Sequence, residues 1–156
     1  MTSSRAFAAL FVLLLLARGT SADSAQESPR DQATNAAKAE MAAFSAGNRA
    51  AFVAAFSPNA TILDDTPPFV WTGREGAGRW FDANRPGVRD VSIIPSAPTD
   101  FAVTPEHTVY VVLPITIRGH GPRGRAFVAH GYWTGVLVRN ARGALQIEYL
   151  TVSLSG

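Results

Sequence analysis

The chain has 156 residues, of which 47% are apolar and 17% are charged, and it contains no cysteine. This composition excludes a disordered or collagen-like chain, and the length fits one domain with its own core. Without cysteine there can be no disulfide, thiol nucleophile, iron–sulfur cluster or thiolate zinc site. His107, His120 and His130 lack the spacing of a metal site, so we expect neither a metal nor an organic cofactor.

The first 22 residues have the pattern of a secretory signal peptide. Arg5 precedes the uncharged apolar run Ala6–Ala17, and Thr20 and Ala22 occupy small-residue cleavage positions. The run is shorter than the roughly 20 apolar residues that span a bilayer, so it does not predict a membrane helix. We therefore expect a secreted or periplasmic protein that is cleaved after Ala22.

Removal of residues 1–22 takes away the excess of positive charge. The full chain has 14 basic and 12 acidic residues, and loss of two arginines with this segment leaves 12 of each. Nucleic acids and anionic membranes bind proteins that carry a surplus of Lys and Arg on one face. We therefore expect no nucleic-acid partner and no membrane association after cleavage.

The next segment, residues 23–30, is polar and has no apolar period, which is typical of a flexible tether. From Asp31 onward apolar residues recur at helical spacing, so we expect a folded domain over 31–156 that begins with a helix. Asp31 is a candidate N-cap of this helix, and Gly47 is a candidate for its C-terminal turn. One face of the helix collects Ala33, Ala37, Met41 and Phe44.

Two shorter helices, separated by a strand, are expected next. Asn48 can cap a helix that extends to Phe56. Residues 60–64 then form a short strand. The segment Thr72–Glu75 matches the S/T-x-x-E capping box and begins a third helix, which we expect to run to about Arg85.

Everything beyond the third helix is expected to be extended. Short turns rich in glycine join the last three segments, and turns of this length produce antiparallel hairpins. Helices followed by strands predict an α+β domain, with three N-terminal helices on the concave face of a curved antiparallel sheet. The predicted strands cover residues 90–95, 99–104, 107–117, 126–139 and 145–154.

Alternation of side chains along a strand assigns the residues of 126–139 to two faces. One face holds Phe127 and Trp133 together with Gly131 and Gly135, which leave room beside the rings. A face that mixes large rings with glycines can line a cavity as well as fill a core. We therefore expect this face to line a pocket for a small, mostly apolar ligand.

The same alternation in segment 145–154 places Tyr149 and Thr151 on the pocket side. Apolar residues then dominate the opposite, outer face of the sheet, and no further helix is predicted to cover it. A large exposed apolar face often marks self-association, so we expect a homodimer formed through this face. The outer face comprises Val128, Tyr132, Val136, Val138, Leu150, Val152 and Leu154.

Three segments of the chain together resemble the nuclear transport factor 2-like superfamily, which includes SnoaL-like cyclases and ketosteroid isomerase. They are AAFVAAFSPNATILDD at residues 50–65, WTGREG at 71–76 and the hairpin over 133–153. The resemblance covers residues 31–153 and implies a cone-shaped sheet around a cavity. The superfamily contains isomerases, dehydratases, hydrolases, cyclases and non-catalytic binders, so the fold by itself does not select a function.

The resemblance also implies roles for individual residues. Asp64 falls where ketosteroid isomerases carry their general base. Glu40 stands at the position of their tyrosine donor, and Gly135 lies near the position of their protonated aspartic acid. An ionised glutamate cannot donate a hydrogen bond and glycine has no side chain, so we expect the isomerase donors to be missing.

The candidate catalytic residues are therefore Asp64 as base and Tyr149 as hydrogen-bond donor. Ordinary structural roles compete with these: Asp64 and Asp65 can cap the turn before two prolines, and a buried tyrosine can bond the backbone. Core packing likewise competes with ligand contact for the tryptophans. The candidate ligand-binding residues are Trp71, Trp80, Phe127, Trp133 and Thr151.

We thus carry three hypotheses from the sequence. The first is a secreted or periplasmic domain that binds a small, mostly apolar molecule in its cone. The second is a cofactor-independent isomerase, dehydratase or cyclase with Asp64 as general base. The third is a non-catalytic dimeric interaction module.

Overall fold

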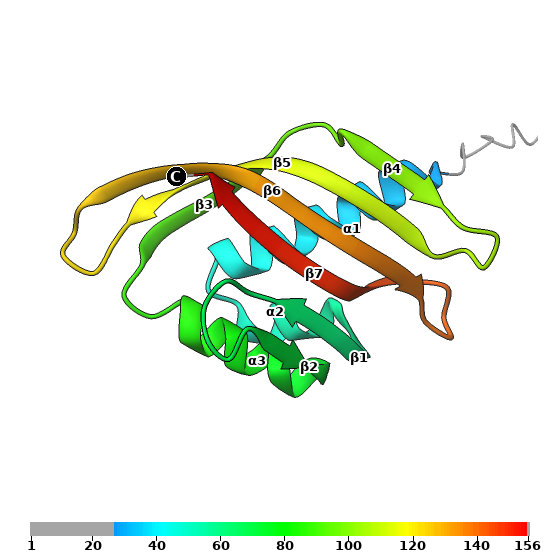
Figure 1. The fold of residues 1–156 in the computed structure, drawn as a ribbon, viewed down its shortest axis with the longest axis horizontal. Coiled ribbons are helices and arrows are strands. Elements are labelled where there is room, and N and C mark those ends of the chain that lie inside the picture. The colour runs from blue at the N-terminus through cyan, green and yellow to red at the C-terminus, as the bar shows by residue number, and fades with distance from the viewer. Residues whose placement is uncertain (1–26, 156) are drawn as a thin grey trace, which may run out of the picture.

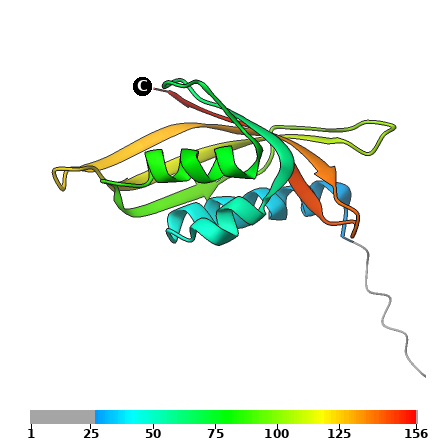
Figure 2. The same cartoon turned by 90° about the horizontal axis from the view of Figure 1, so that it is seen from below.

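Residues 27–155 form three helices and seven strands, and the helices cover the concave side of one curved sheet (Figures 1 and 2). A computed structural model describes residues 27–155. The predicted signal peptide lies outside these residues. The predicted α+β class is confirmed. The elements are α1 (Pro29–Ser45), α2 (Arg49–Ala54), β1 (Phe56–Leu63), β2 (Val70–Thr72), α3 (Gly73–Asn84), β3 (Arg89–Pro95), β4 (Asp100–Val103), β5 (Val109–His120), β6 (Ala126–Arg139) and β7 (Leu145–Ser155).

The N-cap of the first helix lies three residues earlier than the sequence pattern predicts. Pro29 is the first residue of the helix, and the Ser28 hydroxyl accepts a hydrogen bond from the Asp31 backbone N–H at 3.1 Å. Serine as N-cap followed by proline is a favourable helix start, because proline has no N–H to leave unpaired. Asp31 is therefore in the first turn of α1 and is not its N-cap.

The second helix starts where predicted but is shorter. Asn48 caps α2 by accepting from the Ala51 backbone N–H at 3.0 Å. Phe56, expected in this helix, opens β1 instead, because it pairs with Ile147 of β7 and its side chain is completely buried. A long-range pairing thus overrides the local helical spacing.

The capping box predicted for α3 does not form. Thr72 is the N-cap residue, but its side chain makes no capping hydrogen bond, and Glu75 pairs instead with Arg79 at 2.6 Å. Thr72 is also the last residue of β2, where it pairs with Thr61 of β1. The short strand β2 is absent from the sequence-based prediction.

The sheet has the order β2-β1-β7-β6-β5-β3. Strand β3 pairs with the second half of β5, and β4 pairs with the first half. Every pair is antiparallel except β1 with β7, which run parallel. This pair joins strands from opposite ends of the domain, so no local turn predicts it. The long strands β5, β6 and β7 bend together over the helices (Figure 1).

A β-bulge in β7 changes which side chains face the helices. Val136 of β6 pairs with Tyr149, whereas the next residue, Leu137, pairs with Ile147, so Glu148 is an extra residue. One extra residue reverses the alternation of faces beyond it. Ile147 and Leu150 are both 1% exposed, and Tyr149 is 50% exposed.

The bulge corrects the faces predicted for the last strand. Tyr149, Thr151 and Ser153 follow it on the outer side, while Leu150 is in the core and Val152 and Leu154 line the cavity described below. Strand β6 has no bulge between Ala126 and Val136, so its side chains alternate regularly. The predicted faces of Phe127, Val128 and Trp133 are therefore those observed.

Five aromatic rings pack between the helices and the sheet. Phe52 of α2 lies at their centre and stacks on Trp80 of α3, with ring centroids 5.6 Å apart and planes 10° from parallel. Phe44, Phe56 and Phe81 contact the Phe52 ring at centroid distances of 5.1–5.8 Å. This packing fixes the position of the Trp80 indole, which also belongs to the cavity.

Candidate functional site

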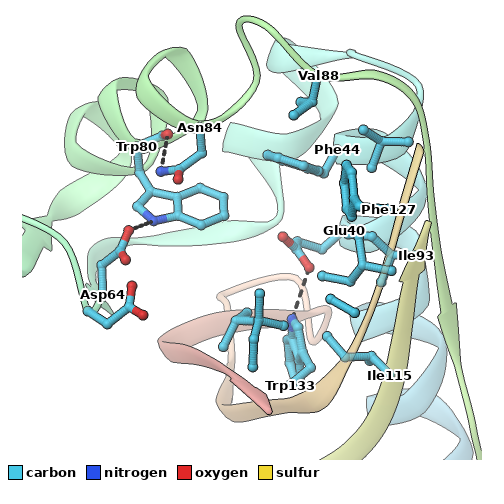
Figure 3. A pocket seen from close by; sticks show the side chains of 16 residues that line it. Glu40, Phe44, Asp64, Trp80, Asn84, Val88, Ile93, Ile115, Phe127 and Trp133 are labelled. Atoms are coloured by element: carbon cyan, nitrogen blue, oxygen red, sulfur yellow. Dashed lines mark hydrogen bonds between the residues drawn. The ribbon is translucent and has the colours of Figure 1, made fainter. Parts of the chain in front are cut away.

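A cavity of about 230 Å³ lies between the helices and the concave face of the sheet (Figure 3). Its volume is below the roughly 300–1,000 Å³ of pockets for drug-sized ligands, so it suits a molecule of one or two rings. Four polar side chains interrupt the otherwise apolar and aromatic lining: Glu40, Asp64, Asp65 and Asn84. The remaining lining residues are Phe44, Trp80, Val88, Val91, Ile93, Ile115, Ile117, Phe127, Ala129, Trp133, Val152 and Leu154.

Glu40 extends from α1 into the cavity and is only 4% exposed (Figure 3). The indole Nε1 of Trp133 donates a hydrogen bond to its Oε2 at 3.0 Å. Burial raises the pKa of the Glu40 carboxyl to about 8, against the weaker opposing effect of the Trp133 hydrogen bond. At pH 7 the carboxyl is therefore mostly neutral.

A neutral carboxyl corrects the expectation that Glu40 is ionised and cannot donate. One oxygen accepts from Trp133, and the acid retains a proton that it can donate to a ligand in the cavity. The sequence contained a signal for this burial. Glu40 lies three residues after Ala37 and four before Phe44, so it shares the buried face of α1 with them.

Gly135 makes room for the indole that holds Glu40. A Cβ atom on Gly135 would lie 2.2 Å from Cη2 of Trp133, far closer than atoms can approach. Trp133 is 1% exposed, and the hydrogen bond from its indole to Glu40 holds the ring in this position. Gly135, near the position of a protonated acid in the family resemblance, here lets Trp133 lie flat over the strand.

Asp64 follows the end of β1 and lies on the opposite side of the cavity from Phe127 and Ile93 (Figure 3). Trp80 Nε1 donates to its Oδ2 at 2.6 Å, and the Thr66 backbone N–H and hydroxyl donate to Oδ1 at 3.2 and 3.1 Å.

Partial burial alone would raise the pKa of Asp64, but the hydrogen bonds that Trp80 and Thr66 donate to it outweigh burial and lower the pKa below its usual value. The carboxylate is ionised at pH 7. Its low basicity makes it a weak proton acceptor.

The structure brings together four of the seven candidate residues. Asp64, Trp80, Phe127 and Trp133 all line the cavity. The other three are not among the lining residues: the bulge turns Tyr149 and Thr151 outward, and Trp71 belongs to β2 at the edge of the sheet.

Trp71 packs against the outside of the core from this edge position. It pairs with Ile62 of β1 and lies close to the backbone of Gly76 in α3. Alternation of side chains could not assign Trp71 to a face from the sequence, since β2 has only three residues.

Between residues 27 and 155 no three His, Asp or Glu side chains gather as possible metal ligands. Within the same range no helix is long and apolar enough to cross a membrane. The two carboxyl groups that matter in the cavity, Glu40 and Asp64, are each bonded to an indole instead.

Comparison with known proteins places the fold. A ketosteroid isomerase-like protein from Erwinia carotovora atroseptica matches with a TM-score of 0.68 and 16% identity over 79% of this chain and 93% of that one. A candidate scytalone dehydratase from Novosphingobium aromaticivorans matches with a TM-score of 0.70 and 13% identity over 80% and 83%. A candidate calcium/calmodulin-dependent protein kinase II association domain from Xanthomonas campestris matches with a TM-score of 0.69 and 14% identity over 80% of this chain and 86% of that one.

No protein-family model and no curated protein matches the sequence. These structures match about four-fifths of this chain at TM-scores near 0.7, and a further match with a TM-score of 0.70 is described as a member of the NTF2-like family, so this protein has the nuclear transport factor 2-like fold. The resemblance seen in the sequence is thereby confirmed at the level of fold. The names of the three neighbours range from isomerase and dehydratase to association domain, and the identities are too low to carry a function over.

The raised pKa of Glu40 predicts a specific pH dependence of stability. Between pH 4.5 and 8 the unfolded chain loses the proton from Glu40 while the folded chain keeps it. The free energy of unfolding should therefore fall as pH rises through this window, by on the order of 3–5 kcal/mol. Urea unfolding of the wild type and of Glu40→Gln at pH values from 4 to 9 gives the free energy of unfolding as a function of pH. The difference between the two slopes of free energy against pH measures this contribution.

Glu75→Gln is the matched control, because Glu75 is exposed on α3 and pairs only with Arg79. It should keep the wild-type slope. Identical slopes for the wild type and Glu40→Gln would contradict the neutral carboxyl.

Gly135→Ala should displace the Trp133 indole and break its hydrogen bond to Glu40. Overpacking of this kind costs about 1–3 kcal/mol of unfolding free energy. Chemical denaturation gives the cost, and the shift of the Trp133 indole N–H proton in NMR spectra reports the lost bond. Gly121→Ala meets only ordinary contacts and should change stability by less than about 0.5 kcal/mol. An unchanged indole resonance in Gly135→Ala would contradict the position of the Trp133 ring over Gly135.

Proposed function

We propose that the cavity binds a small, mostly apolar molecule of one or two rings that carries a carbonyl-type oxygen, and that neutral Glu40 donates a hydrogen bond to this oxygen. The observation that carries the proposal is the Glu40 carboxyl, buried in a mostly apolar wall and bonded to Trp133, where burial raises its pKa and keeps it neutral at pH 7. A hydrogen bond in such a mostly apolar site orients a ligand strongly, since the low dielectric strengthens it.

Acid–base catalysis is the second candidate function. Glu40 and Asp64 line one cavity with pKa values shifted in opposite directions, the arrangement that separates acid from base in many enzymes. Glu40 would then act as the acid and Asp64 as the base of a cofactor-independent isomerase, dehydratase or cyclase. The hydrogen bonds that make Asp64 a weak base favour ligand binding as the first candidate.

A pair of ligands that differ in one oxygen tests the proposal. 2-Tetralone should bind about two- to tenfold more tightly than tetralin, the same bicyclic skeleton without the carbonyl, because the neutral acid supplies one hydrogen bond. Titration calorimetry at pH 6 measures both affinities. The preference should vanish in Glu40→Leu and persist in Glu40→Gln, whose amide still donates. It should also weaken above pH 8, where Glu40 ionises.

Failure of both compounds to bind, or equal affinities for the two in the wild type, would overturn the proposal.

The catalytic alternative can be tested with the same protein and the same ketone. In D₂O an active base exchanges the protons next to the carbonyl of 2-tetralone, and Asp64→Asn should abolish exchange without abolishing binding.

We also propose a homodimer through the outer face of the sheet. Tyr110, Val136 and Tyr149 lie side by side across β5, β6 and β7, and Tyr132 and Val128 continue the exposed apolar surface along β6. Val152 and Leu154, which the sequence placed in this surface, belong to the cavity. A two-fold axis is the simplest way to cover an apolar face with a copy of itself.

Light scattering of residues 23–156 at micromolar concentration should give the mass of a dimer. Val136→Glu places a charge at the centre of the row and should yield a monomer. Val103→Glu makes the same change at an exposed valine of β4 and should leave the dimer intact. A wild-type monomer would refute the dimer.

Export through the N-terminal segment is a further proposal, supported by Arg5, the apolar run 6–17 and the small residues Thr20 and Ala22. Expression of the full chain in a bacterial host should give a periplasmic protein whose first residue is Asp23. N-terminal sequencing decides this. Intact chain confined to the cytosol would contradict export.

A further inference from the structure

The cavity and the tip of the β5–β6 hairpin share a wall. Phe127 lines the cavity and is also one of the residues that line a surface groove, together with the hairpin residues Gly121, Pro122, Arg123, Arg125, Ala126 and Val128. A ligand that fills the cavity up to Phe127 therefore lies next to the groove.

The hairpin tip also lies against the rim of the cavity. The loop between α3 and β3 carries the lining residue Val88, and a Cβ atom on the neighbouring Gly87 would lie 3.3 Å from Cγ of Pro122. This contact places Arg123, next to Pro122, beside the loop that borders the cavity.

Positive charge is concentrated at this tip. Arg89 pairs with His120 across β3 and β5, and its Nη2 lies 3.3 Å from where a Cβ on Gly124 would be. Arg118, Arg123 and Arg125 complete a group of four arginines, and residues 107–147 contain no acidic side chain.

The acid that accompanies this group is Asp90, whose carboxylate lies 3.2 Å from His120 Nδ1. Within the described segment 27–155, no arginine of the group takes part in an ion pair. By contrast, the guanidiniums of Arg49 and Arg79 are paired with Asp82 and Glu75. The hairpin arginines thus have a charge that the protein itself does not neutralise.

We infer that the ligand of the cavity carries an anionic oxygen group, a carboxylate or a phosphate monoester, that Arg123 and Arg125 bind in the groove. The inference rests on the function proposed above and adds the class of ligand. The apolar rings fill the cavity, their oxygen accepts from Glu40, and the anionic group extends past Phe127 to the hairpin. Guanidinium groups suit both anions, because their paired N–H donors match two oxygens at once.

Compounds with the same rings and different charges test this inference. 2-Naphthylacetic acid, its neutral methyl ester and 2-naphthyl phosphate are titrated by calorimetry into residues 23–156 at low salt. The acid or the phosphate should bind about tenfold more tightly than the ester, which corresponds to one charge-assisted interaction. The preference should shrink as salt is added.

Variants assign the preference to the hairpin. Arg123→Gln/Arg125→Gln should bind the acid, the phosphate and the ester with equal affinity, and the affinity for the ester should match that of the wild type. Arg142→Gln removes an exposed arginine from the β6–β7 turn and should keep the full preference. Excess 2-tetralone should displace the acid, which shows that the rings occupy the cavity.

The outcomes separate the two proposals. Equal affinities in the wild type, or a preference that survives in the double variant, would overturn the anionic group and leave the cavity function standing. Binding of the acid without displacement by 2-tetralone would mean that the arginines bind anions independently of the cavity, which also overturns the inference. Failure of all three compounds, together with failure of 2-tetralone, would overturn the cavity function itself.

Discussion

The buried hydrogen bond between Glu40 and Trp133 is the constraint on which the site depends. A carboxyl group buried in apolar surroundings is tolerated only when it is neutral and bonded, because an isolated charge there costs far more than one hydrogen bond returns. The bond joins the middle of α1 to the middle of β6, so it also fixes helix and sheet at one register. The absence of a side chain at Gly135 makes room for the Trp133 ring in this arrangement, and burial among the apolar walls keeps the acid neutral.

The cavity contains the same chemical pair twice with opposite outcomes. In each pair an indole N–H donates to a carboxyl oxygen: Trp133 to Glu40 and Trp80 to Asp64. Glu40 is buried and has one donor, so desolvation raises its pKa. Asp64 remains partly solvated and has additional donors in Thr66, so its pKa falls. Solvent access and donor number therefore decide the protonation state, while the donor type is shared.

Sequence patterns were sufficient for features that depend on neighbours along the chain. The N-cap at Asn48, the existence of three helices and the two C-terminal hairpins follow from local residue preferences and spacing. Alternation in segment 126–139 assigned Phe127 and Trp133 to the cavity, because a strand without a bulge keeps its faces. The family resemblance placed Asp64 at the end of a strand, beside the cavity where it is found.

Only the tertiary structure decided the features that depend on distant residues. The extra residue Glu148 in β7 moved Tyr149 out of the predicted site, and neither sequence spacing nor composition signals such a bulge. The parallel pairing of β1 with β7 drew Phe56 out of its helix. The charge of Glu40 likewise follows from the packing of a strand 93 residues away, since a carboxyl group keeps or loses its proton according to its surroundings in space.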